Sequence, residues 1–95
     1  NYPLQPVLVV LYNYFSKLML VHAAHDRSEK ALATQLGVNP YFVKDYLTGF
    51  QRFPAEKTVQ VLATIRQADA QSKGVDVGSV DEGAILRDLV FRILH

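Results

Sequence analysis

The chain has 95 residues, 49% of them hydrophobic, and its 10 Lys and Arg nearly balance its 9 Asp and Glu, which leaves a formal net charge of +1. A chain of this length forms one domain that buries roughly 65% of its unfolded surface, so it can build a core without cross-links. The lack of cysteine excludes disulfides, thiolate metal sites and cysteine nucleophiles, and the balanced charge argues against a module that binds nucleic acid mainly through phosphates.

Apolar residues recur with the period of an α-helix, and no run alternates strictly as a half-buried strand does. The sequence therefore predicts an all-α fold, a five-helix bundle in a single domain over residues 1–95. Asn1 stands where a start Met would, so we expect this domain to be part of a longer chain.

A first helix is predicted over about residues 3–25. Its core stripe consists of Leu4, Leu8, Leu11, Phe15 and Leu18, with Val7, Val10, Tyr14 and Val21 beside it. On the opposite face Val9, Tyr12 and Leu20 stand among polar residues. Since a helix that is apolar nearly all round is buried on more than one side, we predict that these three contact a partner, with a missing segment of the same chain as the alternative.

The same helix raises the question of a membrane span. A spanning helix needs about 20 nearly uninterrupted apolar residues. Proline and polar residues interrupt this run at Pro6, Asn13, Ser16, Lys17 and His22. We therefore expect no membrane insertion.

Residues 29–47, EKALATQLGVNPYFVKDYL, have the residue pattern of a helix-turn-helix-like pair. The first of its helices is predicted over about residues 28–36 and is capped by Asp26 or Ser28. Its inward-facing residues are Ala31, Leu32 and Leu36. Gly37 suits the left-handed turn that follows.

The next helix is predicted to start at Asn39 and Pro40, because Asn accepts an orphan backbone amide and Pro needs no partner there. It runs to about Arg52. Its core stripe is Val43, Leu47 and Phe50, flanked by Phe42 and Tyr46.

A helix that reads a DNA groove offers donors such as Arg, Lys, Gln or Asn near its N-terminus. The exposed positions here carry Tyr41, Phe42, Lys44, Asp45 and Thr48. Because Asp45 would repel phosphate and the aromatics are typical of partner contact, we expect the pair to be architectural, with Tyr41 at a partner interface. A helix-turn-helix DNA-binding domain of a transcriptional regulator is the alternative.

A fourth helix is predicted from Pro54 to about Lys73. One of its faces carries Thr58, Val61, Leu62, Ile65, Ala68, Asp69 and Ser72. Residues 74–83, GVDVGSVDEG, read as a loop, and a fifth helix is predicted from about Asp81. The stripe of this last helix is Ile85, Leu86, Leu89, Val90, Ile93 and Leu94.

Asp69 places a carboxylate on an apolar stripe, where an unpaired charge is costly. In one interpretation it lies at the edge of the stripe and pairs with Lys73, four residues on, for on the order of a few tenths of a kcal/mol. In the other it is a buried fixed point that binds the fifth helix or a neighbour's backbone. The sequence leaves both open.

His22 and His25 could share one helix face, but Asp26 is the only nearby third ligand and no H-E-x-x-H occurs. We predict solvated histidines near a helix C-terminus, where the dipole favours their protonated form, and no metal site. Nucleotide-binding glycine motifs and paired catalytic carboxylates do not occur in the sequence. We therefore expect no catalysis, no cofactor and no small-molecule ligand.

Three pieces follow in a distinctive order: ALATQLGVNPYFVKDYL, then FQRFPAEKTVQVLATIRQAD, then SKG leading through a glycine-bearing loop into a leucine-rich helix. With these pieces the chain, over about residues 8–94, resembles the C-terminal domain of the delta subunit of bacterial DNA polymerase III, a clamp-loader family. That family has an LGVxPxxVKxxL segment, a helix ending in Ala-Asp, and a Lys-Gly before its last helix. The matching residues are Gly37, Pro40, Val43, Lys44, Ala68, Asp69, Lys73 and Gly74. Asn39 departs from the His that is frequent in the family.

The resemblance implies a collar-type domain at the C-terminal end of its subunit. In clamp loaders such domains pack side by side into a collar that holds ATPase-like domains below it. The implied function is therefore subunit association in DNA replication, in the bacterial cytoplasm, with the other loader subunits as partners and DNA contacted only indirectly. Near-neutral charge and outward-facing apolar residues fit protein contact better than phosphate contact.

Overall fold

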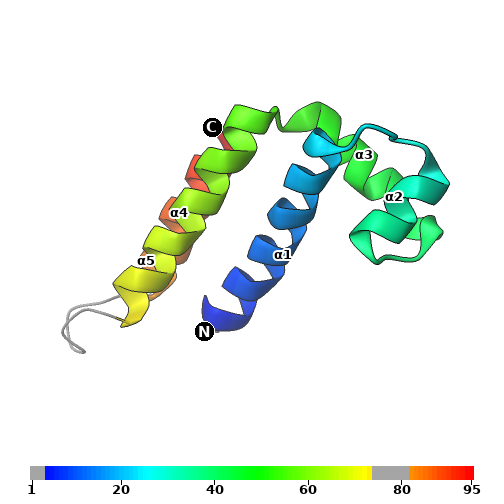
Figure 1. Cartoon of the computed structure of the whole chain (residues 1–95). Helices are drawn as coiled ribbons and strands as arrows, with labels where there is room; N and C mark the ends of the chain where they lie inside the picture. The colour runs from blue at the N-terminus through cyan, green and yellow to red at the C-terminus, as the bar shows by residue number, and fades with distance from the viewer. Residues whose placement is uncertain (1–3, 74–81) are drawn as a thin grey trace.

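A computed structural model describes residues 4–73 and 82–95 (Figure 1). Within these ranges lie five α-helices: α1 Leu4–Ala23, α2 Glu29–Leu36, α3 Val43–Arg52, α4 Ala55–Lys73 and α5 Glu82–Leu94. A 3-10 turn, η1, covers Pro40–Phe42. The described residues contain no strand, so the all-α prediction with five helices is confirmed. The predicted loop from residue 74 and the predicted helix start at Asp81 fall outside the described residues, apart from residues 82 and 83.

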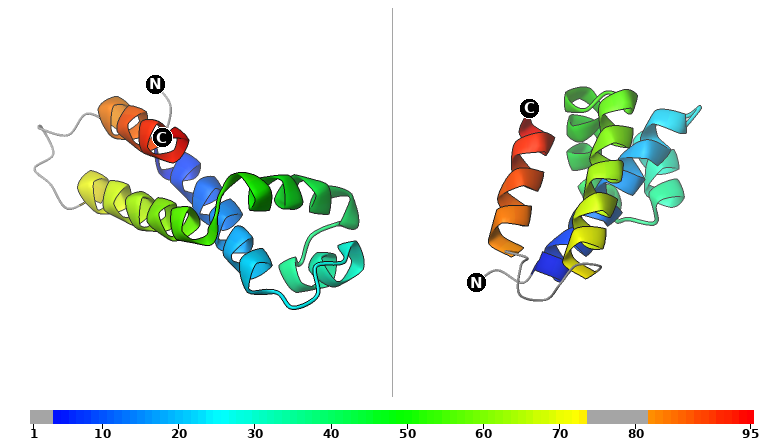
Figure 2. Two further views of the ribbon diagram at one scale, coloured as in Figure 1. Left: turned by 90° about the horizontal axis from the view of Figure 1, so that it is seen from above. Right: turned by 90° about the vertical axis from the view of Figure 1, so that its left-hand side faces the viewer.

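Helices α1, α4 and α5 lie side by side, with α4 running antiparallel to the other two (Figures 1 and 2). Helix α4 packs against both neighbours, whereas α1 meets α5 over a shorter stretch. Helices α2 and α3 pack around the C-terminal end of α1 (Figure 1). The domain is therefore elongated, with extents of 48 × 23 × 18 Å and a radius of gyration of 15.0 Å, where a compact domain of this length would show about 12 Å.

Two clusters of buried side chains form the core. The first lies between α1, α4 and α5 and consists of Leu4, Leu8, Phe15, Leu18, Val61, Ile65, Ala68 and Leu89. The second lies where α1 meets the α2–α3 pair and consists of Val21, Ala24, Leu32, Ala33, Leu36 and Val43. Helix α1 contributes to both clusters and Tyr46 packs against both, so the helix-turn-helix-like pair is joined to the bundle by continuous packing.

The turns around α2 use the predicted capping residues. Ser28 Oγ accepts a hydrogen bond from the Ala31 amide at 3.4 Å, and Asp26 Oδ1 accepts one from the Ser28 amide at 2.9 Å, so both candidate caps are used. The hydrogen bonds from Ser28 lower the pKa of the Asp26 carboxyl. Gly37 has a φ of 69°, in the left-handed region that glycine adopts without strain. Asn39 Oδ1 accepts from the Tyr41 amide at 2.9 Å and starts η1, with Pro40 in its first turn.

The apolar stripes are narrower than predicted. Val10, predicted beside the core stripe, is 66% exposed. On α5, Val90 and Leu94 are 43% and 62% exposed, and Phe42 of η1 is 49% exposed. These predictions were wrong because helical periodicity gives the direction of a side chain, whereas burial depends on whether another helix covers that direction.

Among the described helices α1 alone is long and apolar enough, by length and composition, to cross a bilayer. Five of its residues, Leu4, Leu8, Phe15, Leu18 and Val21, are buried inside the domain. Core helices of globular domains meet the same length and composition criteria, so this property is weak evidence for a span.

Candidate partner-binding surface

A groove of about 340 Å³ runs between the N-terminal half of α1 and the C-terminal half of α4. It is lined by Gln5, Leu8, Val9, Tyr12, Asn13, Ile65, Arg66, Asp69 and Lys73. Leu8 and Ile65 belong to the buried core, whereas Val9 and Tyr12 are 57% and 38% exposed. The groove therefore joins the core of the domain to apolar side chains that face solvent.

Part of the polar lining is already paired. Gln5 Nε2 donates to Ser72 Oγ at 2.6 Å and so links α1 to α4. Lys73 Nζ lies 3.3 Å from Asp69 Oδ1, and the Asp69 side chain is 40% exposed. Asp69 thus lies at the edge of its stripe and pairs with Lys73, as in the first of the two interpretations, and it is not a buried fixed point.

Three other polar side chains of the groove have no partner among the residues that the structure describes. Neither Tyr12, Asn13 nor Arg66 makes a side-chain hydrogen bond or ion pair with any described residue. All three carry N–H or O–H donors, and Arg66 carries a full positive charge. The Tyr12 hydroxyl and the Asn13 side-chain carbonyl can also accept hydrogen bonds, so the distinctive free group of the groove is the cationic Arg66.

The structure separates the four residues predicted to meet a partner. Val9 and Tyr12 share the groove. Leu20, 42% exposed, does not line it and stands eight positions beyond Tyr12, about 12 Å along the helix. Tyr41, 80% exposed, lies on η1 with its ring 5.4 Å from that of Phe42. It lines a different hollow, together with Glu29, Pro40, Lys44 and Asp45.

Sequence reasoning did not assign Asn13 and Arg66 to this surface. The available signal was spacing, because Arg66, Asp69 and Lys73 recur at intervals of three and four along α4, which places them on one side of a helix. The same spacing relates Val9 to Asn13 on α1. Periodicity alone could not show that these two helix faces lie next to each other in the folded domain.

Apolar side chains are exposed outside the groove as well. They include Val10, Val59, Phe91 and Leu94.

The outer face of α3, where a DNA-reading helix would carry its donors, has mixed charge. Lys44, Asp45, Thr48, Gln51 and Arg52 are all exposed. Acidic Asp45 follows Lys44 directly, so these residues do not form a continuous ridge of cations. This face lacks the clustered positive charge that phosphate contacts require.

At the C-terminal end of α1 the side chains of Arg27, Phe50 and His22 form a contact cluster that was not predicted from the sequence. Arg27 Nε and Nη2 donate to the carbonyl oxygens of Val21 and His22 at 2.9 and 3.0 Å. The Arg27 guanidinium lies 4.6 Å from the centre of the Phe50 ring, which also contacts the His22 ring. His22 Nε2 lies 2.8 Å from the Phe53 carbonyl oxygen.

The prediction of a solvated histidine is therefore wrong for His22, because α3 folds back over it, whereas His25 is exposed as predicted. Within the described residues no group of three or more His, Asp or Glu could hold a metal ion. His22 thus has a packing role at the junction of α1 and α3.

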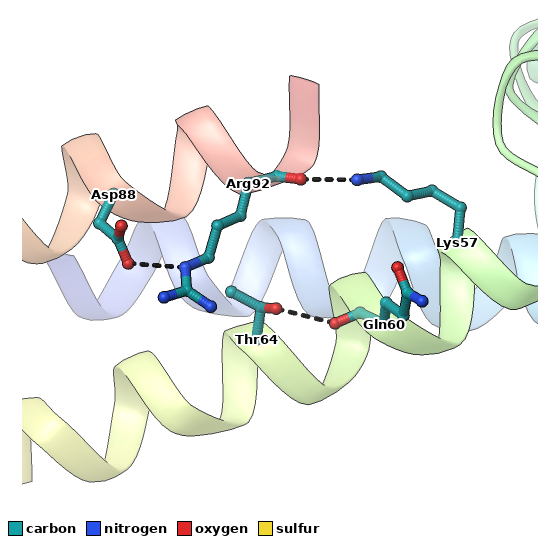
Figure 3. A network of polar contacts seen from close by, with 5 residues as sticks. All are labelled: Lys57, Gln60, Thr64, Asp88 and Arg92. Atoms are coloured by element: carbon teal, nitrogen blue, oxygen red, sulfur yellow. Dashed lines mark hydrogen bonds and ion pairs between the residues drawn. The ribbon is translucent and has the colours of Figure 1, made fainter. Parts of the chain in front are cut away.

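A second groove, of about 490 Å³, lies between α4 and α5 and is more polar. Figure 3 shows the polar contacts beside it. Lys57 Nζ donates to the Arg92 carbonyl oxygen at 2.7 Å, near the C-terminal end of α5. Arg92 Nε in turn donates to Asp88 Oδ2 at 2.9 Å. These charged side chains are paired with one another or with the backbone, so they hold α5 on α4 and leave little free charge for a ligand.

Comparison of the chain with protein-family models, curated proteins and solved structures found no match. Function is therefore inferred from the residues and surfaces described above.

Proposed function

We propose that this domain acts in subunit assembly, as the collar-forming C-terminal domain of a clamp-loader delta subunit in bacterial DNA replication, with no catalysis of its own. The observation that carries the proposal is the outer face of α1. Val9, Tyr12 and Leu20 lie exposed along a helix whose other side forms the core. On an isolated domain these side chains would face water, whereas a neighbouring subunit would bury them.

Two properties of the surface support association with protein rather than nucleic acid. The net charge is only +1, so few phosphates could be neutralised. Large apolar side chains are also exposed outside the α1–α4 groove, among them Val59 and Phe91, and such residues suit contact with protein.

The resemblance to the delta subunit gives the proposal its specific form. Its matching residues include Gly37 and Pro40, and each has a structural role: Gly37 adopts a left-handed φ and Pro40 starts η1. Val43 is fully buried between the helices of the pair and α1. Gly74, the last matching residue, falls outside the described residues.

The test is assembly with loader subunits. The variants Val9→Glu and Leu20→Glu place a carboxylate on the outer face of α1 and should abolish co-purification with partner subunits while leaving the domain folded, as judged by circular dichroism. Val10→Glu is the matched control, because Val10 is more exposed than Val9 but lies about 80–100° away from Val9 and Leu20 around the helix. Complete assembly of both interface variants would contradict the proposal.

The helix-turn-helix-like pair supports a second candidate, a DNA-binding domain of a regulator, because α3 presents an exposed face with Lys44, Thr48 and Arg52. Titration of duplex DNA at two salt concentrations separates the candidates. Tight binding that weakens steeply with salt would favour the regulator, because released counterions dominate such affinity. The assembly domain should bind duplex DNA weakly at both concentrations.

A further inference from the structure

The α1–α4 groove has the length of a short helical segment. Its lining runs from Gln5 to Asn13 on α1 and from Ile65 to Lys73 on α4. Eight residue steps of an α-helix extend about 12 Å, or roughly two turns. A partner helix laid along the groove could therefore present two successive side chains on the same face.

The chemistry of the lining selects the partner. Leu8, Val9 and Ile65 offer an apolar contact. The acid of the groove, Asp69, is already neutralised by Lys73. Within residues 4–73 and 82–95 the Arg66 guanidinium has no ion-pair partner, and the Tyr12 hydroxyl in the same groove has no hydrogen-bond partner. A complementary partner needs an aliphatic side chain and, one turn away, a carboxylate.

We propose that the α1–α4 groove binds an acidic amphipathic helix of a neighbouring subunit, whose aliphatic side chain contacts Leu8, Val9 and Ile65 and whose carboxylate pairs with Arg66. This inference rests on the proposed role in subunit assembly and names the kind of partner surface involved. A second copy of the chain, whose exposed Val59 stands one turn from the exposed Glu56 on α4, is the alternative occupant that the dimerisation test below separates.

The probe is a fluorescent amphipathic peptide of about 18 residues, long enough to form a helix in solution, with leucines on one face and glutamates beside them. Two matched peptides carry Gln or Lys in place of Glu. Binding to the 95-residue chain is measured by fluorescence anisotropy at low and high salt. We expect the Glu peptide to bind, the Gln peptide to bind at least about tenfold more weakly, and the Lys peptide not to bind.

Charge reversal locates the interaction. Arg66→Glu should weaken binding of the Glu peptide at least about tenfold and should allow the Lys peptide to bind instead. Arg66→Gln is the milder second variant. It should lower the affinity for the Glu peptide without allowing the Lys peptide to bind. Arg52→Glu, an exposed arginine on α3 without a side-chain partner in the described chain, is the matched control and should change the affinity less than about twofold.

Equal affinity for the three peptides, no binding of the Glu peptide, or equal losses in the Arg66 and Arg52 variants would each overturn the inference. So would dimerisation of the chain alone, by sedimentation velocity, that Arg66→Glu abolishes, because the occupant would then be a second copy. If Val9→Glu breaks loader assembly but the peptides are not distinguished, this inference alone fails. If the Glu peptide binds as expected but Val9→Glu and Leu20→Glu both leave assembly complete, the proposed function fails.

Discussion

Gly49 of α3 lies directly against Tyr14 of α1, so closely that a Cβ atom at position 49 would overlap the tyrosine hydroxyl. The same atom would lie 3.0 Å from Leu18 Cδ2, in the buried core. The Tyr14 ring cannot easily move away, because it stacks on Tyr46 at 5.1 Å and meets the edge of Phe15 at 5.3 Å. A residue without a side chain is thus what lets the helix-turn-helix-like pair approach α1.

The variant Gly49→Ala should therefore lower the free energy of unfolding. Overpacking costs about 1–3 kcal/mol, and the higher helix propensity of alanine returns about 0.5–1 kcal/mol, so we expect a net loss of about 1 kcal/mol by urea denaturation. Adding Tyr14→Phe removes the overlapping hydroxyl and should recover part of the loss. A stabilised Gly49→Ala variant would show that α1 and α3 are not in close contact.

Stability should fall in alkaline solution partly through Tyr14. Burial, and then the nearby Tyr46 and Asp45, raise the pKa of Tyr14 above its ordinary value of 10.0. The folded state therefore holds this proton more tightly than the unfolded state. This contribution to stability is fully present below pH 10.0 and is lost as the pH rises through the raised folded value.

Tyr14→Phe removes this titrating group while keeping the ring. The free energy of unfolding of this variant should fall less steeply than that of the parent chain as the pH rises above 10.0. At neutral pH the two chains should have similar stability, because the lost hydrogen bond, from the Tyr14 hydroxyl to the Asp45 carbonyl oxygen, is long at 3.4 Å. Urea denaturation of both chains across this pH range measures the difference. Parallel curves would mean that Tyr14 does not contribute to the pH dependence.

The turn between α2 and η1 should depend on two residues. Gly37→Ala places a Cβ atom in a left-handed conformation and should cost about 1–2 kcal/mol. Asn39→Ala leaves the Tyr41 amide without its side-chain acceptor and should cost about 0.5–2 kcal/mol. The control is Gln51→Ala, an exposed position on α3, which should be close to neutral. Thermal unfolding compares the three, and equal midpoints would contradict the role of the cap and turn.

Asp69→Asn should have only a small effect on stability. The Asp69 and Lys73 side chains are 40% and 65% exposed, so their ion pair is screened by solvent and contributes about 0.5 kcal/mol or less. The difference from the parent chain, measured in urea, should shrink as salt is added. A loss of about 3 kcal/mol or more would instead identify Asp69 as a buried charge that needs its partner.

Local signals in the sequence determined the helices. Ser28 and Asn39 act as caps, and Gly37 takes the left-handed turn, because each effect depends on hydrogen bonds and dihedral angles within a few residues. The bounds of α1, α2 and α4 were predicted to within about two residues for the same reason, whereas the third helix, predicted from Asn39 and Pro40, opens as the 3-10 turn η1 and becomes α3 only at Val43. The sequence also identified Val9 and Tyr12 as apolar residues on the outer side of the first helix, where the structure exposes them.

Only the tertiary structure decided which helix faces meet. Val9 and Val10 are adjacent valines of one helix, yet Val9 lines the groove against α4 while Val10 lies outside it. Helical periodicity gives the direction of each side chain, but it does not show which side of the helix another helix will pack against. The same holds for His22, which α3 covers, and for Gly49, whose need for a bare backbone comes from Tyr14 thirty-five residues earlier. Such contacts join residues that are far apart in the chain. They therefore contribute to stability only after the helices have packed, and local sequence patterns do not reveal them.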